Sequence, residues 1–146
     1  MVSEFHKLLR VDLTLYRSMK GESARPSLGR SHAALEVVVE GPRADIQGDR
    51  EGYVNPGKHG MSVAPKDPLY LPAHRLPKAF GGTGSYELWS LSVLELPDDL
   101  EYHPSSNTHG VISPARRMTL HAYEELLYST RLSWQSVVAL PQRDTL

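Results

Sequence analysis

The sequence predicts a single compact domain of the α/β (α+β) class, with several short strands and one helix near the C-terminus. Residues 11–19 alternate apolar and polar side chains, and residues 86–96 are apolar on two faces, as half-buried and fully buried strands are. From Leu120 onward, apolar residues recur at spacings near three, four and seven, which is typical of an amphipathic helix. A chain of 146 residues fits one domain, so we expect 1–146 to form a single unit.

The composition excludes several classes of protein. With 40% hydrophobic and 23% charged residues the chain is typical of globular proteins, not of disordered or fibrous ones. A formal charge of -1 removes the main argument for a basic face that binds nucleic acid. The absence of cysteine excludes disulfides and thiolate metal sites, and it fits a reducing compartment. Because no apolar run has the length of a membrane span or signal peptide, we expect neither.

The first predicted strand, residues 11–19, carries Arg17 near its end. A cation where a sheet meets a loop is well placed to hold a ligand, although a plain surface arginine is the commoner case. Residues 31–40 fit either a short helix capped by Ser31 or an extended segment through Val37, Val38 and Val39.

The glycine-rich stretch of residues 48–63 contains turn-forming residues and reactive side chains close together in the sequence. Asn55-Pro56-Gly57 predicts a turn. Gly60 could let a ligand approach the backbone with the Ser62 hydroxyl facing it. The alternative is a hairpin whose turn needs glycine and in which Ser62 is a solvated polar residue, and spacing alone favours this alternative.

Residues 64–83 hold several prolines and read as a long loop, a kind of segment that is usually a functional lid or mobile. The following run, Gly81-Gly82-Thr83-Gly84-Ser85, lacks the lysine and the helix of a phosphate-binding loop, so we interpret it as flexible.

The remaining elements follow in order. We expect a strand over 86–96, then short strands over 100–102 and 110–113 separated by a polar turn over 103–109. The helix should begin at the N-cap Thr119, include Trp134 and Val137 and stop before Pro141.

The seven histidines do not predict a metal site, because no two have the i, i+4 spacing of a helical zinc site. His121 and Glu124 are three apart, but one such pair more often marks a solvated helix face. A hydrolase triad of Ser62, His109 and Asp45 would lack the G-x-S-x-G elbow. His109 itself could serve as a general acid or base or be an ordinary surface histidine.

The chain resembles the Tse2-type toxins, small type VI secretion effectors with an ADP-ribosyltransferase-like fold. The similarity spans roughly residues 11–135 and rests on segments that occur in this order: Leu13-Thr14-Leu15-Tyr16-Arg17, Asp45-Ile46, Gly48-Asp49-Arg50-Glu51-Gly52-Tyr53-Val54-Asn55-Pro56, Gly60-Met61-Ser62-Val63, Leu96-Pro97-Asp98-Asp99-Leu100 and Thr108-His109-Gly110-Val111-Ile112-Ser113-Pro114-Ala115-Arg116-Arg117-Met118.

The resemblance implies a split, strongly curved, mixed β core with a C-terminal helix and a cleft for NAD. It implies a mono-ADP-ribosyltransferase used in competition between bacteria, which acts in the cytoplasm of a target cell. It further implies a cognate immunity protein that covers the cleft and a macromolecular acceptor, with nucleic acid as a partner only in that role. In the producer we expect a cytoplasmic protein.

The resemblance implies three catalytic residues at the matching positions of this sequence. Arg17 would hold the NAD phosphates or ribose, Ser62 would lie beside the nicotinamide ribose, and His109 would be a further polar anchor. It also places residues in the NAD site besides Arg17 and Ser62, namely Tyr16, Tyr53 as a stacking partner for nicotinamide, and Met61. No metal is implied.

The sequence departs from the family pattern at two points. Met61 stands where the family toxin has threonine, and neither Glu95 nor Glu101 lies in the Glu-x-Glu motif typical of ADP-ribosyltransferases. Two alternatives therefore stay open. One is a metal-independent ribonuclease-like toxin that uses His109 with a second histidine, and Arg116-Arg117 on phosphate; the other is an inactive NAD-binding or interaction module. For Arg17→Ala and Ser62→Ala we expect loss of toxicity with the fold intact.

Overall fold

The computed structural model describes residues 12–28, 52–57 and 60–140. The predictions for residues 31–40, for Asp45 and for the glycine-rich residues before Gly52 lie outside this part. The strands are β1 (Thr14–Met19), β2 (Gly21–Glu22), β3 (Arg25–Pro26), β4 (Tyr53–Val54), β5 (Met61–Pro65), β6 (Glu87–Ser92), β7 (Leu100–Pro104), β8 (Gly110–Pro114), β9 (Met118–Thr119) and β10 (Gln135–Ser136). The helix is α2 (Leu120–Ser129), and short 3-10 turns are η1 (Pro68–Tyr70), η2 (Lys78–Phe80), η3 (Val93–Glu95) and η4 (Arg131–Ser133).

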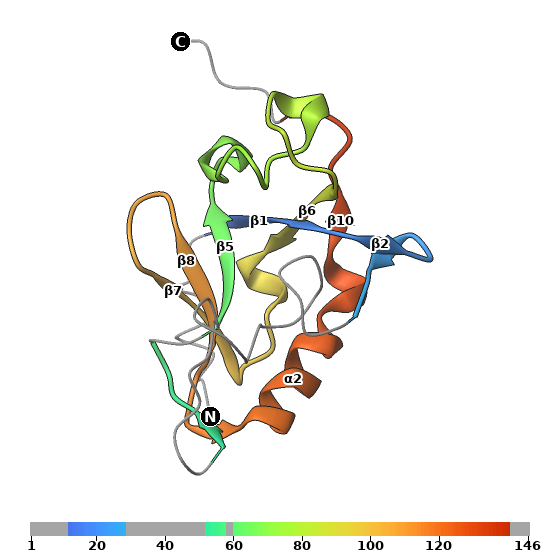
Figure 1. Ribbon diagram of the computed structural model, residues 1–146. Helices are drawn as coiled ribbons and strands as arrows, with labels where there is room; N and C mark the ends of the chain where they lie inside the picture. The colour runs from blue at the N-terminus through green and yellow to red at the C-terminus, as the bar shows by residue number, and fades with distance from the viewer. Residues whose placement is uncertain (1–11, 29–51, 58–59, 141–146) are drawn as a thin grey trace.

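Six of the strands form a sheet that splits between β1 and β5. The strand order is β10-β6-β1-β5-β8-β7, and all the neighbours pair antiparallel. Whereas β1 pairs with β6 along its whole length, it meets β5 only at Leu15↔Pro65 and Tyr16↔Ala64. Beyond these pairs β5 turns steeply away from β1 (Figure 1). The predicted α+β fold with a split core and a C-terminal helix is confirmed.

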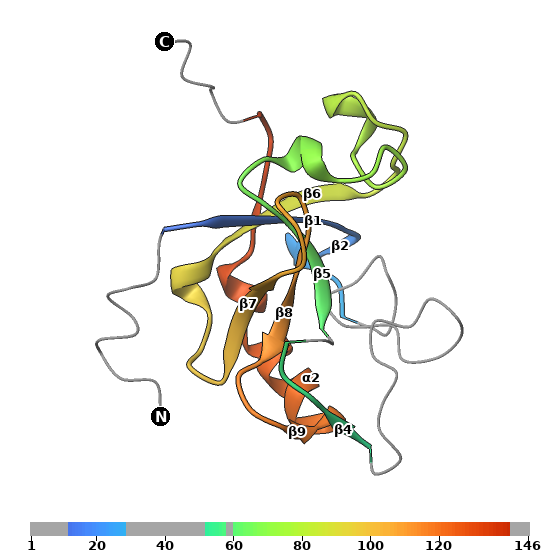
Figure 2. The same cartoon turned by 90° about the vertical axis from the view of Figure 1, so that its left-hand side faces the viewer.

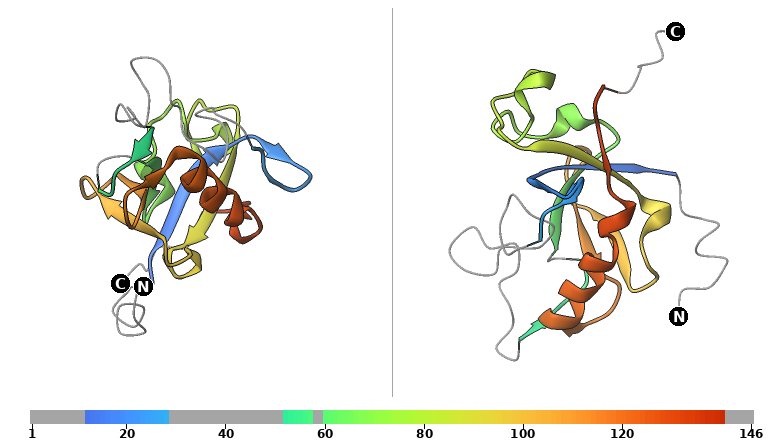
Figure 3. Two further views of the ribbon diagram at one scale, coloured as in Figure 1. Left: turned by 90° about the horizontal axis from the view of Figure 1, so that it is seen from below. Right: turned by 90° about the vertical axis from the view of Figure 1, so that its right-hand side faces the viewer.

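Apolar side chains fill both faces of this sheet, and α2 and the segment with η1 and η2 lie on opposite sides of β1 (Figures 2 and 3). On the α2 side, Tyr123 and Leu127 of the helix join the large core with Leu15, Met61 and Trp89. The smaller cluster on the other side consists of Tyr16, Ala64 and Leu88, against which Leu71, Phe80 and Val137 pack. Because both faces are covered, β1 is buried from Leu15 to Met19.

The loop predicted over residues 64–83 is confirmed from residue 66 onward, where the short turns η1 and η2 interrupt it, whereas Ala64 and Pro65 end β5. Our interpretation of residues 81–85 as flexible is wrong. Backbone N–H groups of Thr83 and Gly84 donate to the carbonyls of Ala73 and Leu76, each at 2.8 Å. A Cβ on Gly84 would lie 2.7 Å from the Arg75 carbonyl oxygen, so glycine is needed for this close packing. The glycines thus let the loop pack closely on itself.

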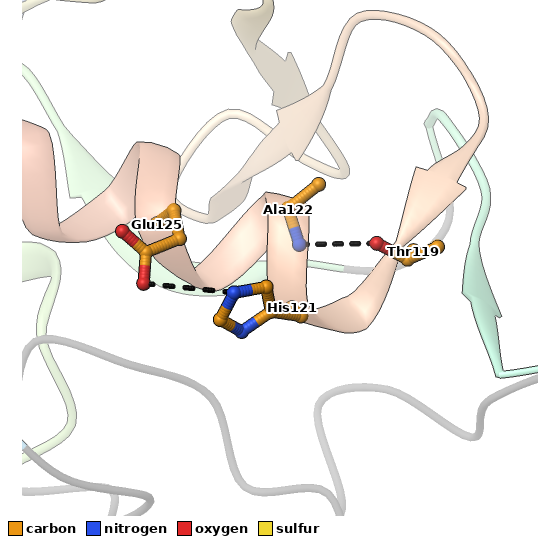
Figure 4. Close-up of polar contacts among 4 residues, drawn as sticks. All are labelled: Thr119, His121, Ala122 and Glu125. Carbon is orange, nitrogen blue, oxygen red and sulfur yellow. Dashed lines mark hydrogen bonds and ion pairs between the residues drawn. The ribbon is translucent and has the colours of Figure 1, made fainter.

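The predicted helix begins where expected and ends early. The Thr119 hydroxyl accepts the Ala122 N–H at 3.1 Å, which confirms the N-cap (Figure 4). The helix stops at Ser129, where the Thr130 hydroxyl bonds the Leu127 carbonyl at 2.7 Å, so Trp134 and Val137 lie beyond it.

The final segment explains why apolar residues continue past the helix. Trp134 is fully buried, and its indole N–H donates to the Thr130 hydroxyl at 3.1 Å. The next residues form β10, which adds an edge strand to β6. The spacing of Trp134 and Val137 therefore reflects packing against the sheet and not a longer helix.

Two further sequence expectations change in the structure. The strand predicted to Leu96 ends at Ser92, whose hydroxyl accepts the Leu94 N–H at 3.2 Å and starts η3. Glu124 is buried at 5% exposure, whereas its neighbour on the exposed face, His121, lies 3.9 Å from Glu125 (Figure 4). The expected solvated His121–Glu124 face is therefore wrong for Glu124.

Gly60 provides close packing of the chain on itself. A Cβ there would collide with the backbone carbonyl of Ile112 on β8, so the space that we assigned to a ligand is filled by the neighbouring strand. The turn prediction for Asn55-Pro56-Gly57 is confirmed, with Gly57 at a φ of 82° and its N–H donating to the Ser113 hydroxyl at 2.7 Å.

Thr119→Ala should lower the free energy of unfolding by about 1 kcal/mol, because the Ala122 N–H loses its capping acceptor. Thr119→Ser keeps the hydroxyl and should remain near wild type. Urea denaturation followed by circular dichroism measures both, and equal stability of the two variants would contradict the assigned cap.

Candidate active site

A pocket of about 220 Å³ opens where β1 and β5 diverge. It is bounded by these two strands, by the loop after β5 and by the turn between β7 and β8. Its lining consists of Arg17, Ser62, Val63, Ala64, Tyr70, Leu71, Pro72, His74, Arg75, Thr108 and His109. The three residues predicted to be catalytic therefore line one pocket: Arg17, Ser62 and His109. The sequence alone could not show that they lie together.

Arg17 lies inside the sheet, not at its end as we predicted. It pairs with Trp89 within β1, which continues to Met19, and only 2% of it is exposed. Its guanidinium Nη1 donates to the Ser62 backbone carbonyl at 2.8 Å. Because β1 and β5 no longer pair at this point, the side chain connects the two halves of the sheet where backbone hydrogen bonds do not.

Ser62 reaches the pocket because side chains alternate along β5. Its neighbours Met61 and Val63 join the large core, and Met61 is fully buried there. Ser62 is half-buried, pairs with Val111 of β8 and lines the pocket. The structure therefore favours the reading of Ser62 as a cleft residue over that of a solvated hairpin serine.

His109 is exposed and ends the turn that precedes β8. Its ring Nδ1 lies 2.6 Å from the Ser105 hydroxyl, and the same hydroxyl lies 3.0 Å from the His109 carbonyl oxygen. The backbone N–H groups of Ser105 and Ser106 also donate to this carbonyl, each at 3.0 Å. The turn thus holds both the backbone and the imidazole of His109.

Sequence reasoning missed the part of the pocket formed by Tyr70, His74, Arg75 and Thr108. The first three belong to the long proline-rich loop, whose length was the only signal of a functional segment. The Asp67 carboxylate starts η1 by accepting the Leu69 N–H at 2.9 Å, and this turn carries Tyr70 to the pocket. Arg75 is held over β1, where its Nη2 donates to the Ser18 carbonyl at 3.3 Å.

The other predicted NAD-binding residues lie elsewhere. Tyr16 is 6% exposed and packs in the smaller core cluster, where burial raises the pKa of its hydroxyl and Asp67 raises it further. Tyr53 pairs with Thr119, and its ring lies 3.9 Å beneath the Arg117 guanidinium. With Met61 in the core, the structure brings none of these three to the pocket.

The electrostatic character of the pocket is basic. Two arginines and two histidines line it beside the hydroxyls of Ser62 and Thr108, and no aspartate or glutamate is among the described lining residues. Glu95 instead lines a separate polar cavity with Thr14, Ser90 and Ser92, while Glu101 is exposed on β7. An anion with hydroxyl groups is the ligand that this lining suits best.

Neither a metal-binding cluster nor a membrane-spanning helix occurs among residues 12–28, 52–57 and 60–140. No group of three or more His, Cys, Asp or Glu side chains there could hold a metal ion. Within the same residues, no helix has the length and apolar character needed to span a membrane.

The split sheet, with a basic, hydroxyl-bearing pocket at the point of divergence, is consistent with the ADP-ribosyltransferase-like class of α+β folds. The family model of the Tse2 ADP-ribosyltransferase toxin matches residues 13–134. The chain belongs to this toxin family, as the resemblance indicated. A comparison with curated proteins finds no match.

Arg17→Ala should lower the free energy of unfolding by about 1–3 kcal/mol, because it leaves the Ser62 carbonyl without this donor. This replaces our expectation of an unaffected fold for that variant. Arg75→Ala, which removes a longer contact at the same pocket, should cost less. Urea denaturation measures both, and wild-type stability of Arg17→Ala would show that the contact does not hold the sheet halves together.

Proposed function

We propose that this protein is a toxin that uses NAD to transfer a single ADP-ribose unit to a macromolecule in the cytoplasm of a susceptible cell. The family supplies the ADP-ribosyltransferase activity. We assign the site to the basic pocket because Arg17, Ser62 and His109 all line it.

The pocket suits part of NAD. Ligand sites of drug size are about 300–1,000 Å³, and this cavity of about 220 Å³ would enclose one half of the dinucleotide. Arg17 and Arg75 supply positive charge for the pyrophosphate, and the Ser62 and Thr108 hydroxyls suit a ribose. The Tyr70 ring, at 42% exposure, is available for stacking on a base at the rim, the role that we first assigned to Tyr53.

The site must stabilise the positive charge that develops on the ribose during the reaction. In the transfer, the bond from ribose C1′ to the nicotinamide nitrogen breaks and its electron pair stays with nicotinamide. An acceptor atom forms the new bond to C1′ and gives up its proton. Since no carboxylate is among the described lining residues, we assign the polar contacts with the ribose to Ser62 and the uptake of the proton to a histidine.

Several features of this proposal follow from the family type and not from the geometry. We propose delivery by type VI secretion in competition between bacteria, with storage in the producer's cytoplasm beside a cognate immunity protein that covers the pocket. The acceptor is a macromolecule, and nucleic acid is a partner only in that role. No membrane partner is proposed.

Ser62→Ala should abolish growth arrest on induction in a bacterial host, together with the loss of intracellular NAD and the incorporation of labelled ADP-ribose. The change removes one hydroxyl at the pocket and leaves the hydrogen bond to the Ser62 backbone carbonyl in place. Ser85→Ala, at an exposed serine outside this pocket, is the matched control and should stay toxic.

The possible results separate the readings. Growth arrest with neither labelled ADP-ribose incorporation nor NAD loss would overturn the transferase assignment. If the wild-type chain causes no arrest, an NAD-binding module without turnover would be favoured. The labelled species in wild-type cultures identifies the acceptor.

One observation favours a second candidate, a metal-independent ribonuclease-like toxin. His74 and His109 line the same pocket as Arg17 and Arg75, which is the set needed for an acid, a base and phosphate binding. Arg116 and Arg117, which we first assigned to phosphate, lie apart from it: Arg116 is 3.5 Å from Asp99, and Arg117 covers Tyr53. Cleavage of RNA by the purified protein without NAD would support this candidate.

A further inference from the structure

The turn between β7 and β8 contains a side-chain contact of Ser105, a residue to which the family resemblance gives no role. Ser105 and His109 are four residues apart, and the Ser105 hydroxyl oxygen contacts both the ring Nδ1 of His109, at 2.6 Å, and its carbonyl oxygen, at 3.0 Å. Both residues are solvent-exposed.

One arrangement of hydrogens turns both contacts into hydrogen bonds at the same time. A serine hydroxyl has one hydrogen and can accept others, whereas a carbonyl oxygen can only accept. If the hydroxyl donates to the carbonyl, its oxygen is left to accept from the ring, which satisfies both contacts with the proton on Nδ1. If it donates to Nδ1 instead, the carbonyl receives nothing from it, although 3.0 Å is a hydrogen-bond distance.

The rest of the turn supports this arrangement. The His109 carbonyl accepts the backbone N–H groups of Ser105 and Ser106, each at 3.0 Å, and these bonds fix its position beside the Ser105 side chain without themselves deciding where the Ser105 hydroxyl hydrogen points. The neighbouring Ser106 hydroxyl is directed elsewhere, since it accepts the Thr108 N–H at 3.2 Å. Only one of the two serines therefore contacts the imidazole.

We propose that Ser105 is a positioning residue that holds neutral His109 in the tautomer with its proton on Nδ1, so that Nε2 carries the lone pair into the pocket. Nε2 lies on the side of the ring away from Nδ1 and Ser105, and His109 lines the pocket. An imidazole in this state accepts hydrogen bonds and protons through Nε2.

The consequence for the reaction rests on the function proposed above. As the acceptor atom bonds to ribose C1′ and nicotinamide leaves with the electron pair of the broken bond, Nε2 takes the proton of the acceptor. The ring then carries a positive charge, and its Nδ1–H still donates to Ser105. The other titratable side chains that line the pocket are Arg17, Tyr70, His74 and Arg75, and none of them belongs to the turn between β7 and β8, so His109 is the base that this turn orients.

The test reads the tautomer directly. Protein made by cell-free synthesis with ¹⁵N-histidine avoids toxicity to a host, and the nitrogen shifts and long-range couplings report which ring nitrogen is protonated. The spectra are recorded at mildly alkaline pH, where an unperturbed imidazole is neutral. A His109→Gln sample assigns the signal.

Wild type should show the proton on Nδ1. Ser105→Ala should shift the ring toward the Nε2–H form and slow NAD turnover on the order of tenfold, a share of the ~10²–10⁴-fold that a general base contributes. Ser105→Thr should restore both readings, and Ser106→Ala, in the same turn, should change neither.

Two results would overturn the proposal: a wild-type ring with its proton on Nε2, or the same tautomer in Ser105→Ala as in wild type. The tautomer is read without NAD, so it decides the role of Ser105 even if no turnover is found. A complete absence of NAD turnover in the wild type would instead count against the proposed function.

Discussion

The hydrogen bond from the buried Arg17 guanidinium to the Ser62 carbonyl is the contact on which the site depends. Antiparallel strands ordinarily join through backbone hydrogen bonds, but β1 and β5 pair at only two positions before they separate. A side chain that crosses this gap lets the sheet split while the half-buried Ser62 keeps a hydrogen-bond donor on its carbonyl. The same geometry places a cation and the Ser62 side chain at the opening, so the irregularity of the sheet and the pocket have one origin.

The pocket is assembled from elements far apart in the sequence, and each is held by its own local hydrogen bonds. The loop after β5 is started by the Asp67 cap and closed on itself through Gly82 and Gly84, while the turn before β8 is held around the His109 carbonyl. Rigid local units of this kind can present side chains with little loss of conformational freedom on binding. The described residues that line the pocket include two arginines and two histidines but no carboxylate. This lining is the basis on which we proposed an anionic nucleotide as the ligand and an imidazole as the proton acceptor.

Local rules predicted much of the fold. The Thr119 cap, the Asn55-Pro56-Gly57 turn and the two short strands over 100–102 and 110–113 depend on residues close in sequence, and all are confirmed. The strands β7 and β8 also pair with each other. The helix was predicted too long because Trp134 continues the apolar pattern, although it is buried by packing after the helix has ended. Tertiary contacts override periodicity at such boundaries.

The sequence by itself determined the fold class and the family, because these follow from periodicity, residue type and motif order. Only the tertiary structure decided that Arg17, Ser62 and His109 share a pocket, and that Tyr16, Tyr53 and Met61 do not line it. It also added Tyr70, His74 and Arg75, whose loop offers no periodicity to read. The physical reason is that the direction of a side chain depends on strand register and loop packing, which long-range contacts set.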